Sequence, residues 1–157
     1  MSSFSRRSVL ALLALGGCGF TPALGTGGAA RQLIGTVRAQ DPENQQDFIF
    51  VARIEDRLGR ADVALYDLRY TARTSAEGVA ITAEGAITRY NLIGSVDWTL
   101  TRRSDGQRMA GGSEDSFTSY SATGSTVAGL TAKEDATRRL MAILADQIVA
   151  RLMVAAL

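Results

Sequence analysis

Residues 66–100 read YDLRYTARTSAEGVAITAEGAITRYNLIGSVDWTL, and this stretch decides the fold. Apolar and polar side chains alternate along both halves, which predicts two strands that each have one buried and one solvent-facing side. The predicted buried side consists of Tyr66, Leu68, Tyr70, Ala72, Tyr90, Leu92, Val96, Trp98 and Leu100. Glu84-Gly85 lies between the halves and predicts a tight hairpin turn, so the two strands should be antiparallel.

The sequence on either side adds further strands. The alternation changes phase near Glu77-Gly78, which predicts a bulge in the first long strand. Asp105-Gly106 predicts a second hairpin turn. Residues 107–119 follow it, and their many glycines and serines are typical of a weaker strand at a sheet edge. Residues 33–38 predict one more short strand.

A first helix is predicted over about 42–58. Asp41 can cap the free amide groups of a helix start, and Pro42 suits the first helical position because it has no amide to lose. Four apolar residues recur at helical spacing, and a glycine then supplies the end: Phe50, Val51, Ile54, Leu58 and Gly59.

A second helix is predicted at the C-terminal end of the sequence, after a loop over 121–130. Thr131 and Glu134 have the spacing of a capping box, which predicts the helix start. Asp135 and Arg139 form a predicted ion pair one turn apart. The apolar stripe consists of Ala136, Leu140, Ile143, Leu144, Ile148 and Leu152.

The order of these elements predicts an α+β fold. Strand, helix, three strands and helix follow one another, and no internal repeat interrupts them. Two helices should pack on one face of a four-stranded, mostly antiparallel sheet, because each element must bury its apolar side against another. We expect a single domain over residues 32–157.

The first residues have the pattern of a secretory signal. Arg6 and Arg7 precede a short apolar run over 9–15, and two glycines then lead to Cys18. The run is too short to span a bilayer, which takes about 20 apolar residues. Leu15-Gly16-Gly17-Cys18 resembles the lipobox of bacterial lipoproteins, in which the cysteine is acylated after cleavage before it. We expect a signal peptide over 1–17 and a lipidated flexible tether over 18–31.

Two points about this segment stay open. Arg6 and Arg7 fit both the general secretory route and a twin-arginine signal. Cys18 could also be a buried cysteine at the end of an ordinary apolar helix. The sequence contains no other cysteine, so a disulfide within the chain is excluded.

Composition argues against an enzyme. The sequence has no histidine, and acylation would occupy its single cysteine, so the usual general base and the common zinc ligands are missing. Loss of Arg6 and Arg7 with the signal leaves 15 basic and 16 acidic side chains, a net charge of −1. We therefore expect no metal, no cofactor and no nucleic-acid partner.

Arginine dominates the basic residues. All of them are arginine except Lys133. A GC-rich genome explains this bias, and so does bidentate recognition of phosphate groups. Composition does not separate the two explanations.

Several stretches of the sequence together match one protein family. The lipobox continues as Cys18-Gly19-Phe20-x-Pro22, and Thr88-Arg89-Tyr90-Asn91-Leu92 leads into a strand that ends Trp98-Thr99-Leu100. The last helix supplies the other matching stretches: Glu134-Asp135-Ala136, Arg139-Leu140, Ala145-Asp146-Gln147-Ile148 and Arg151-Leu152. Taken together, these stretches resemble the LptE family of lipopolysaccharide-assembly lipoproteins.

The resemblance implies an outer-membrane lipoprotein that is anchored on the periplasmic side. Its partner would be the β-barrel that inserts lipopolysaccharide into the outer leaflet, and the chain would act as a plug inside that barrel. Gly19 in place of an aspartate implies sorting to the outer membrane. Lipopolysaccharide itself would be bound by basic residues, for which the candidates are Arg69, Arg73, Arg89, Arg102 and Arg103.

Two other functions remain as alternatives. One is an auxiliary lipoprotein of a lipid transporter linked to the inner membrane. The other is a carboxylate-dependent lipoprotein hydrolase. For each candidate arginine, an ordinary solvated charge on a strand face is also a reasonable interpretation.

Overall fold

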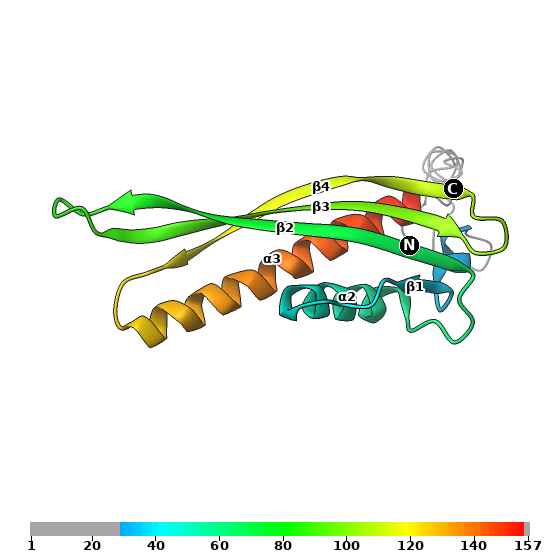
Figure 1. The fold of residues 1–157 in the computed structure, drawn as a ribbon, viewed down its shortest axis with the longest axis horizontal. Helices are drawn as coiled ribbons and strands as arrows, with labels where there is room; N and C mark the ends of the chain where they lie inside the picture. Colours follow the sequence, from blue (N-terminus) through cyan, green and yellow to red (C-terminus); the bar gives the residue numbers. More distant parts are fainter. Residues whose placement is uncertain (1–28, 156–157) are drawn as a thin grey trace, which may run out of the picture.

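A computed structural model describes residues 29–155, and it has the predicted element order (Figure 1). The elements are the 3₁₀ helix η2 (Ala29–Leu33), β1 (Val37–Ala39), α2 (Gln45–Leu58), β2 (Tyr66–Ile81), β3 (Ile87–Arg102), β4 (Arg108–Ser121) and α3 (Thr126–Ala155). The expected signal peptide over 1–17, the acylation of Cys18 and most of the tether lie outside the described residues.

The predicted α+β fold is confirmed. The sheet order is β1-β2-β3-β4, with β1 parallel to β2 and the other pairs antiparallel. Both helices lie on the same face of the sheet (Figure 1). The even-numbered side chains of β2 and β3 form one core with the two helices, as the alternation predicted.

The molecule is elongated, and its two ends differ (Figure 1). We call the end with η2, the turn over 103–106 and the last turn of α3 the proximal end. The distal end carries the hairpin turn over 82–86, and α3 begins near it. The first described residues therefore lie at the proximal end, far from the long hairpin tip.

Both predicted hairpin turns and the predicted bulge are present. Gly85 and Gly106 have φ values of 85° and 69°, the left-handed region that a glycine adopts without strain. The pairing of β2 with β3 shifts register between Gly78 and Ala80. The Gly- and Ser-rich stretch forms β4, which is an edge strand as expected.

The predicted start of α2 at Asp41-Pro42 is wrong. The helix begins at Gln45, and Asn44 is its N-cap. The Asn44 Oδ1 atom accepts hydrogen bonds from the amides of Gln46 and Asp47 at 2.9 and 3.0 Å. Asparagine caps a helix as well as aspartate does, and here it lies closer to the apolar stripe.

The predicted start of α3 at Thr131 is also wrong, because the helix begins five residues earlier. The Ser125 hydroxyl oxygen accepts a hydrogen bond from the Ala128 amide at 3.3 Å and caps the helix there. Thr131 lies inside the helix and donates to the Val127 carbonyl. The first turns bury little apolar area, since Val127 and Leu130 are exposed, so no periodic pattern marked them.

The N-terminal strand is shorter than predicted. Gly35 has a φ of 70° and breaks the chain into η2 and the three-residue β1. Its amide donates to the Leu58 carbonyl at the end of α2. Leu33 and Val37 are both buried, on either side of that turn. The 3₁₀ helix also overlaps the last residues of the range expected to be a tether.

The packing of α3 on β3 depends on a glycine. A Cβ atom at Gly94 would stand 2.9 Å from Leu140 Cδ2 and 3.1 Å from Leu144 Cδ1. Real Cβ atoms essentially never lie as close to another atom as 2.9 Å, so the Leu140 side chain would have to shift if residue 94 carried one. Five residues of the predicted stripe are fully buried, but Ile143 is 39% exposed because it lies beside this line of contact.

An ion cluster joins α2 to α3. The Asp146 carboxylate on α3 accepts from Arg53 Nε at 3.0 Å and from Arg57 Nε at 2.8 Å, both on α2. The hydrogen bond from Arg57 is the largest cause that lowers the pKa of Asp146, which falls from 3.8 to about 2. One carboxylate thus holds two guanidinium groups against the helix pair.

We predict that Gly94→Val lowers the free energy of unfolding by about 2 kcal/mol, because overpacking forces α3 away from the sheet. Gly129→Ala is the matched control, since a Cβ there meets nothing within 4 Å and lies inside a helix. It should leave stability unchanged or raise it by up to about 1 kcal/mol. Urea denaturation followed by circular dichroism measures both, and equal stability of the two variants would contradict the close approach.

We also predict that Asp146→Asn lowers stability at pH 7 by about 1 kcal/mol. The pKa of Asp146 is lower in the folded chain, so the stability it contributes is fully present above about pH 4 and is lost as the pH falls towards 2. The difference between variant and wild type should therefore shrink over that range. Urea denaturation at several pH values measures it, and a difference that does not change with pH would count against the ion cluster.

Candidate functional site

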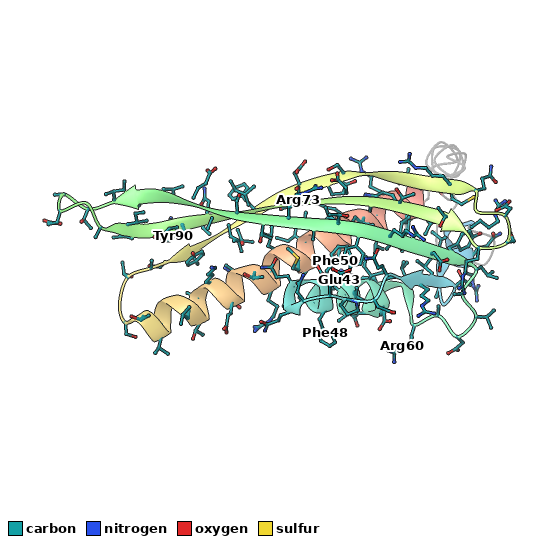
Figure 2. All side chains as sticks on the ribbon, viewed as in Figure 1. Glu43, Phe48, Phe50, Arg60, Arg73 and Tyr90 are labelled. Atoms are coloured by element: carbon teal, nitrogen blue, oxygen red, sulfur yellow. The ribbon has the colours of Figure 1, made fainter. Side chains whose placement is uncertain are left out.

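The face of the sheet opposite the helices is open, and we call it the open face. It carries the odd-numbered side chains of β2 and β3 and their partners on β4, in lateral rows such as Arg69, Thr99 and Gly111. Most of these side chains are polar or charged, with Phe117 as an exposed exception. Figure 2 labels Arg73 on the sheet, with Phe48 and Arg60 on the helix side.

Three of the five predicted arginines lie on the open face. These are Arg69, Arg73 and Arg89. Arg69 and Arg73 are four residues apart on β2, about 13 Å along the strand. Arg89 lies towards the distal end, where it pairs with Ala80 on β2. Along β2, Ala80 is more than about 30 Å from Arg69, at roughly 3.3 Å per residue. The structure therefore does not bring all three together.

Arg73 is paired with a carboxylate. Its Nη1 atom lies 2.6 Å from Asp97 Oδ2 on β3. This hydrogen bond, with a second one from Ser113, holds the pKa of Asp97 below its ordinary value. Arg69 and Arg89 have no such ion pair within residues 29–155.

The other two predicted arginines serve the proximal turn. Arg102 Nη1 lies 3.0 Å from Asp105 Oδ2, within the turn itself. Arg103 Nε lies 3.1 Å from Asp67 Oδ2 on β2. A hydrogen bond from the Gln107 amide, followed by that from Arg102, lowers the pKa of Asp105. The positive charges of Arg102 and Arg103 are each balanced by a carboxylate nearby. These two residues therefore stabilise the turn, and neither charge is free for a ligand.

The prediction from sequence missed Arg108. It lies at the start of β4, opposite Thr101, and has no ion pair within residues 29–155. Its guanidinium group lies over Gly111, where a Cβ would stand 2.9 Å from Arg108 Nε. In the sequence, Gly111 and Gly112 indicate that there is room for a long side chain beside this part of the strand. Only the strand register, however, places Arg108 near Arg69.

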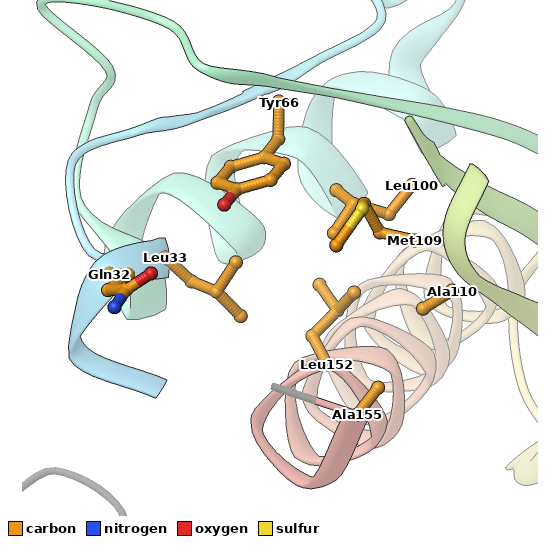
Figure 3. A pocket seen from close by; sticks show the side chains of 8 residues that line it. All are labelled: Gln32, Leu33, Tyr66, Leu100, Met109, Ala110, Leu152 and Ala155. Atoms are coloured by element: carbon orange, nitrogen blue, oxygen red, sulfur yellow. The ribbon is translucent and has the colours of Figure 1, made fainter. Parts of the chain in front are cut away.

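A small pocket lies at the proximal end of the core (Figure 3). Its volume is about 140 Å³, and η2, α3 and the three long strands surround it. None of the lining side chains is charged: Gln32, Leu33, Tyr66, Leu100, Met109, Ala110, Leu152 and Ala155. Such a lining is mostly apolar and suits an apolar group, with the Gln32 amide and the Tyr66 hydroxyl as its polar side-chain groups. No helix within the described part of the chain is long and apolar enough to cross a bilayer.

The family model for LptE, described as lipopolysaccharide-assembly, matches residues 34–152. The match covers nearly all of the described domain.

The chain belongs to the LptE family.

Solved structures agree with this fold. A protein from Caulobacter crescentus superposes with a TM-score of 0.68 at 22% identity, and the match covers 80% of this chain and 93% of that one. The rare lipoprotein B from Shewanella oneidensis gives 0.59 at 14% identity, covering 76% and 92%. A minor lipoprotein from Acinetobacter baumannii gives 0.52 at 17% identity, covering 76% and 89%. No curated protein matches the chain.

This LptE chain is therefore a member of a non-enzymatic family of lipopolysaccharide-assembly lipoproteins. The resemblance that the sequence suggested is confirmed. On the open face, Arg73 is paired with a carboxylate, whereas Arg69 and Arg89 have no ion pair within the described residues. This face is therefore the surface suited to a polar partner or an anionic ligand.

We predict that Arg73→Gln raises the pKa of Asp97 towards its ordinary value, because the variant removes the charged hydrogen-bond donor that lowers it. Carboxylate NMR titration measures this pKa. Arg89→Gln is the control on the same face, and it should leave Asp97 unchanged. An unchanged pKa in the Arg73 variant would show that the ion pair is not formed in solution.

Proposed function

We propose that this chain is an outer-membrane lipoprotein, anchored through acyl chains on Cys18, and that it acts as plug and assembly partner of the barrel that inserts lipopolysaccharide. The LptE family match carries the proposal. The lumen of a large barrel is polar, and the open face gives this small domain a mostly polar outer surface, with Phe117 as an exposed exception.

The two ends of the molecule suggest how it is oriented. Ten residues separate Cys18 from Ala29, and they can span at most about 35 Å. The proximal end therefore stays near the periplasmic leaflet that would hold the acyl chains. The distal hairpin points away from it (Figure 1), so we infer that the hairpin enters the barrel.

Lipopolysaccharide would be bound on the open face or at its ends. Arg69 and Arg89 are the two predicted arginines without an ion pair in the described residues, and they remain the better candidates. Arg73, Arg102 and Arg103 would each have to leave a carboxylate before binding a phosphate. Two or more acyl chains on Cys18 would give stable attachment, whereas one alone binds only marginally.

The orientation can be tested with single cysteines, because acylation would block Cys18 itself. Ser104→Cys places a thiol in the proximal turn and Glu84→Cys places one in the distal turn, and both positions are exposed. In cells with a permeabilised outer membrane, a bilayer-impermeant maleimide should label position 104 and spare position 84. Both should react equally in the purified chain, and equal labelling in cells would contradict the plug.

The partner itself is tested by affinity purification of the full chain from outer membranes. We expect a large barrel to co-purify, and depletion of the chain should reduce surface lipopolysaccharide. Cys18→Ser should release the protein from the outer-membrane fraction. A stable barrel with normal lipopolysaccharide export after depletion would refute the proposal, and recovery of the wild type with the inner membrane would favour the transporter alternative.

A further inference from the structure

The outer edge of β2 has no strand beside it over much of its length. β1 pairs with β2 only from Tyr66 to Leu68, and the chain then turns away at Asp41-Pro42 towards α2. β2 itself continues to Ile81 and extends well past β1 (Figure 1). The row of the sheet that β1 begins to fill is therefore vacant beside residues 71–78 of β2, which we call the free edge.

The backbone groups at the free edge point outwards. The Leu68 carbonyl accepts from the Gln40 amide at 2.8 Å, and the Tyr66 amide donates to the Thr36 carbonyl at 3.1 Å, so the even-numbered residues of β2 direct their backbone groups towards β1. The pairing with β3 keeps this register as far as Gly78. Within residues 29–155, no hydrogen bond reaches the outward backbone groups of Ala72, Thr74, Ala76 and Gly78.

The free edge also lacks the features that usually protect a sheet edge. Such edges carry proline, lysine, an inward-pointing charge or a bulge, which prevents another strand from pairing. Residues 71–78 contain no proline and no lysine, and their charged side chains, Arg73 and Glu77, lie on the open face. The register shift comes only at the distal end, after Gly78. All the residues of the free edge are exposed or half-buried.

The opposite edge of the sheet, on β4, is different. There α3 lies beneath the strand, and Arg139 of α3 donates to the Ser119 carbonyl oxygen at 3.2 Å. A side chain of the chain itself thus occupies part of the β4 edge. No side chain in the described part of the chain does the same for the free edge.

The chemistry of the free edge selects an extended polypeptide. Outward amides and carbonyls that recur along a strand are matched by the backbone of another strand, since each buried group must find a partner. Other ligands do not offer donors and acceptors at this repeat. The vacant row is collinear with β1, so an added strand would continue the sheet order that the chain begins.

The side chains along the free edge indicate the sequence pattern of that polypeptide. On the helix side, Ala76 and Gly78 are small and leave space for larger apolar groups. The Ile87 side chain lies over Gly78 and is 38% exposed, so it offers an apolar contact there. On the open face, Glu77 has no ion pair within the described residues, whereas Arg73 is already bound by Asp97. Apolar residues should therefore alternate with polar ones, with a basic residue near Glu77.

We propose that the free edge of β2 binds an extended segment of another protein by strand addition, with apolar side chains towards the helix side and a basic side chain near Glu77. The inference rests on the proposed function, because the barrel around the plug is the protein that would supply the segment. It assigns the contact to one sheet edge and to backbone hydrogen bonds, and it leaves the open face available.

Hydrogen exchange tests the contact directly. The full-length acylated chain is purified in detergent, alone and together with the barrel, and amide exchange is followed by mass spectrometry with fragmentation to single residues. The amides of residues 72, 74, 76 and 78 should exchange at least about tenfold more slowly in the complex. The odd-numbered amides bond to β3 and should be protected in both samples. Equal exchange of the even-numbered amides with and without the barrel would overturn the proposal.

A proline separates backbone pairing from side-chain contact. Ala76→Pro removes an amide that points outwards, so the ladder with β3 stays intact. We expect its affinity for the purified barrel, measured by thermophoresis in detergent, to fall about fivefold or more. Ala76→Ser keeps the amide and should change the affinity by less than about twofold. Circular dichroism melting confirms that the variants fold, and equal affinities of the two variants would contradict strand addition.

The same change on the other edge is a second control. Ser113 is an odd-numbered residue of β4, whose backbone groups point away from β3. Ser113→Pro should leave the affinity for the barrel within about twofold of the wild type. A loss as large as that of Ala76→Pro would show that the effect is not specific to the free edge, and would overturn the proposal.

A synthetic peptide tests the free edge without the barrel. The probe is a nine-residue peptide in which valine alternates with threonine and one central threonine is replaced by arginine. The control is the same peptide with alternate amides N-methylated, which cannot form the hydrogen bonds of a strand. In NMR titrations of the full-length chain, the first peptide should shift the amide signals of residues 72–78 and the second should not. Equal shifts with both peptides would contradict backbone pairing.

A second copy of the chain is the competing occupant. Sedimentation of the chain alone at increasing concentration detects it. A dimer in which the even-numbered amides of the free edge become protected would show that the edge pairs with itself, and would overturn the proposal. A monomer with unprotected amides supports it.

Failure of this contact and failure of the proposed function give different results. If the barrel co-purifies but the amides at 72–78 stay unprotected in the complex, the strand addition is wrong and the proposed function stands. If no barrel co-purifies but the unmethylated peptide alone binds at the free edge, the edge accepts a strand and the plug is wrong.

Discussion

The contact between α3 and β3 at Gly94 sets the geometry of this protein. Because no side chain separates them there, the Leu140 and Leu144 side chains lie directly on the strand. The helix can then bury one side along most of its length, and α2 packs beside it through its own apolar stripe and the Asp146 ion cluster. A domain of this size has only one core, and this contact holds α3 close to the face of β3 that carries the buried side chains.

The open face is the consequence. With both helices on one side, the odd-numbered side chains of the strands have no layer above them. The chain places charges there and pairs only some of them, as in Arg73–Asp97 across neighbouring strands and Arg103–Asp67 between the proximal turn and β2. Exposed ion pairs of this kind add little stability. Their effect is to distribute charge unevenly, so that Arg69 and Arg108 stand apart from the neutralised pairs around them.

The elongated shape separates the two ends of the molecule. The β2–β3 hairpin continues well beyond α2 towards the distal end (Figure 1). There the sheet has fewer neighbours, and Val79 and Ile81 are exposed. The chain enters the domain at the other end, next to the end of α3. A lipid anchor on Cys18 would therefore hold the domain by its proximal end and leave the hairpin to reach away from the membrane surface.

The sequence by itself determined the element types, the order of the elements and the buried faces, because alternation and helical spacing are local signals. Leu68, Val96 and Phe50 could be assigned to the core without any knowledge of their neighbours. It did not determine where α2 and α3 begin, because Asn44 and Ser125 cap as well as the residues that were preferred. Only the tertiary structure decided which charges are balanced and which meet. The pairing of Asp97 with Arg73, and the approach of Arg108 to Arg69, depend on strand register and on the space above Gly111, which no single stretch of sequence records.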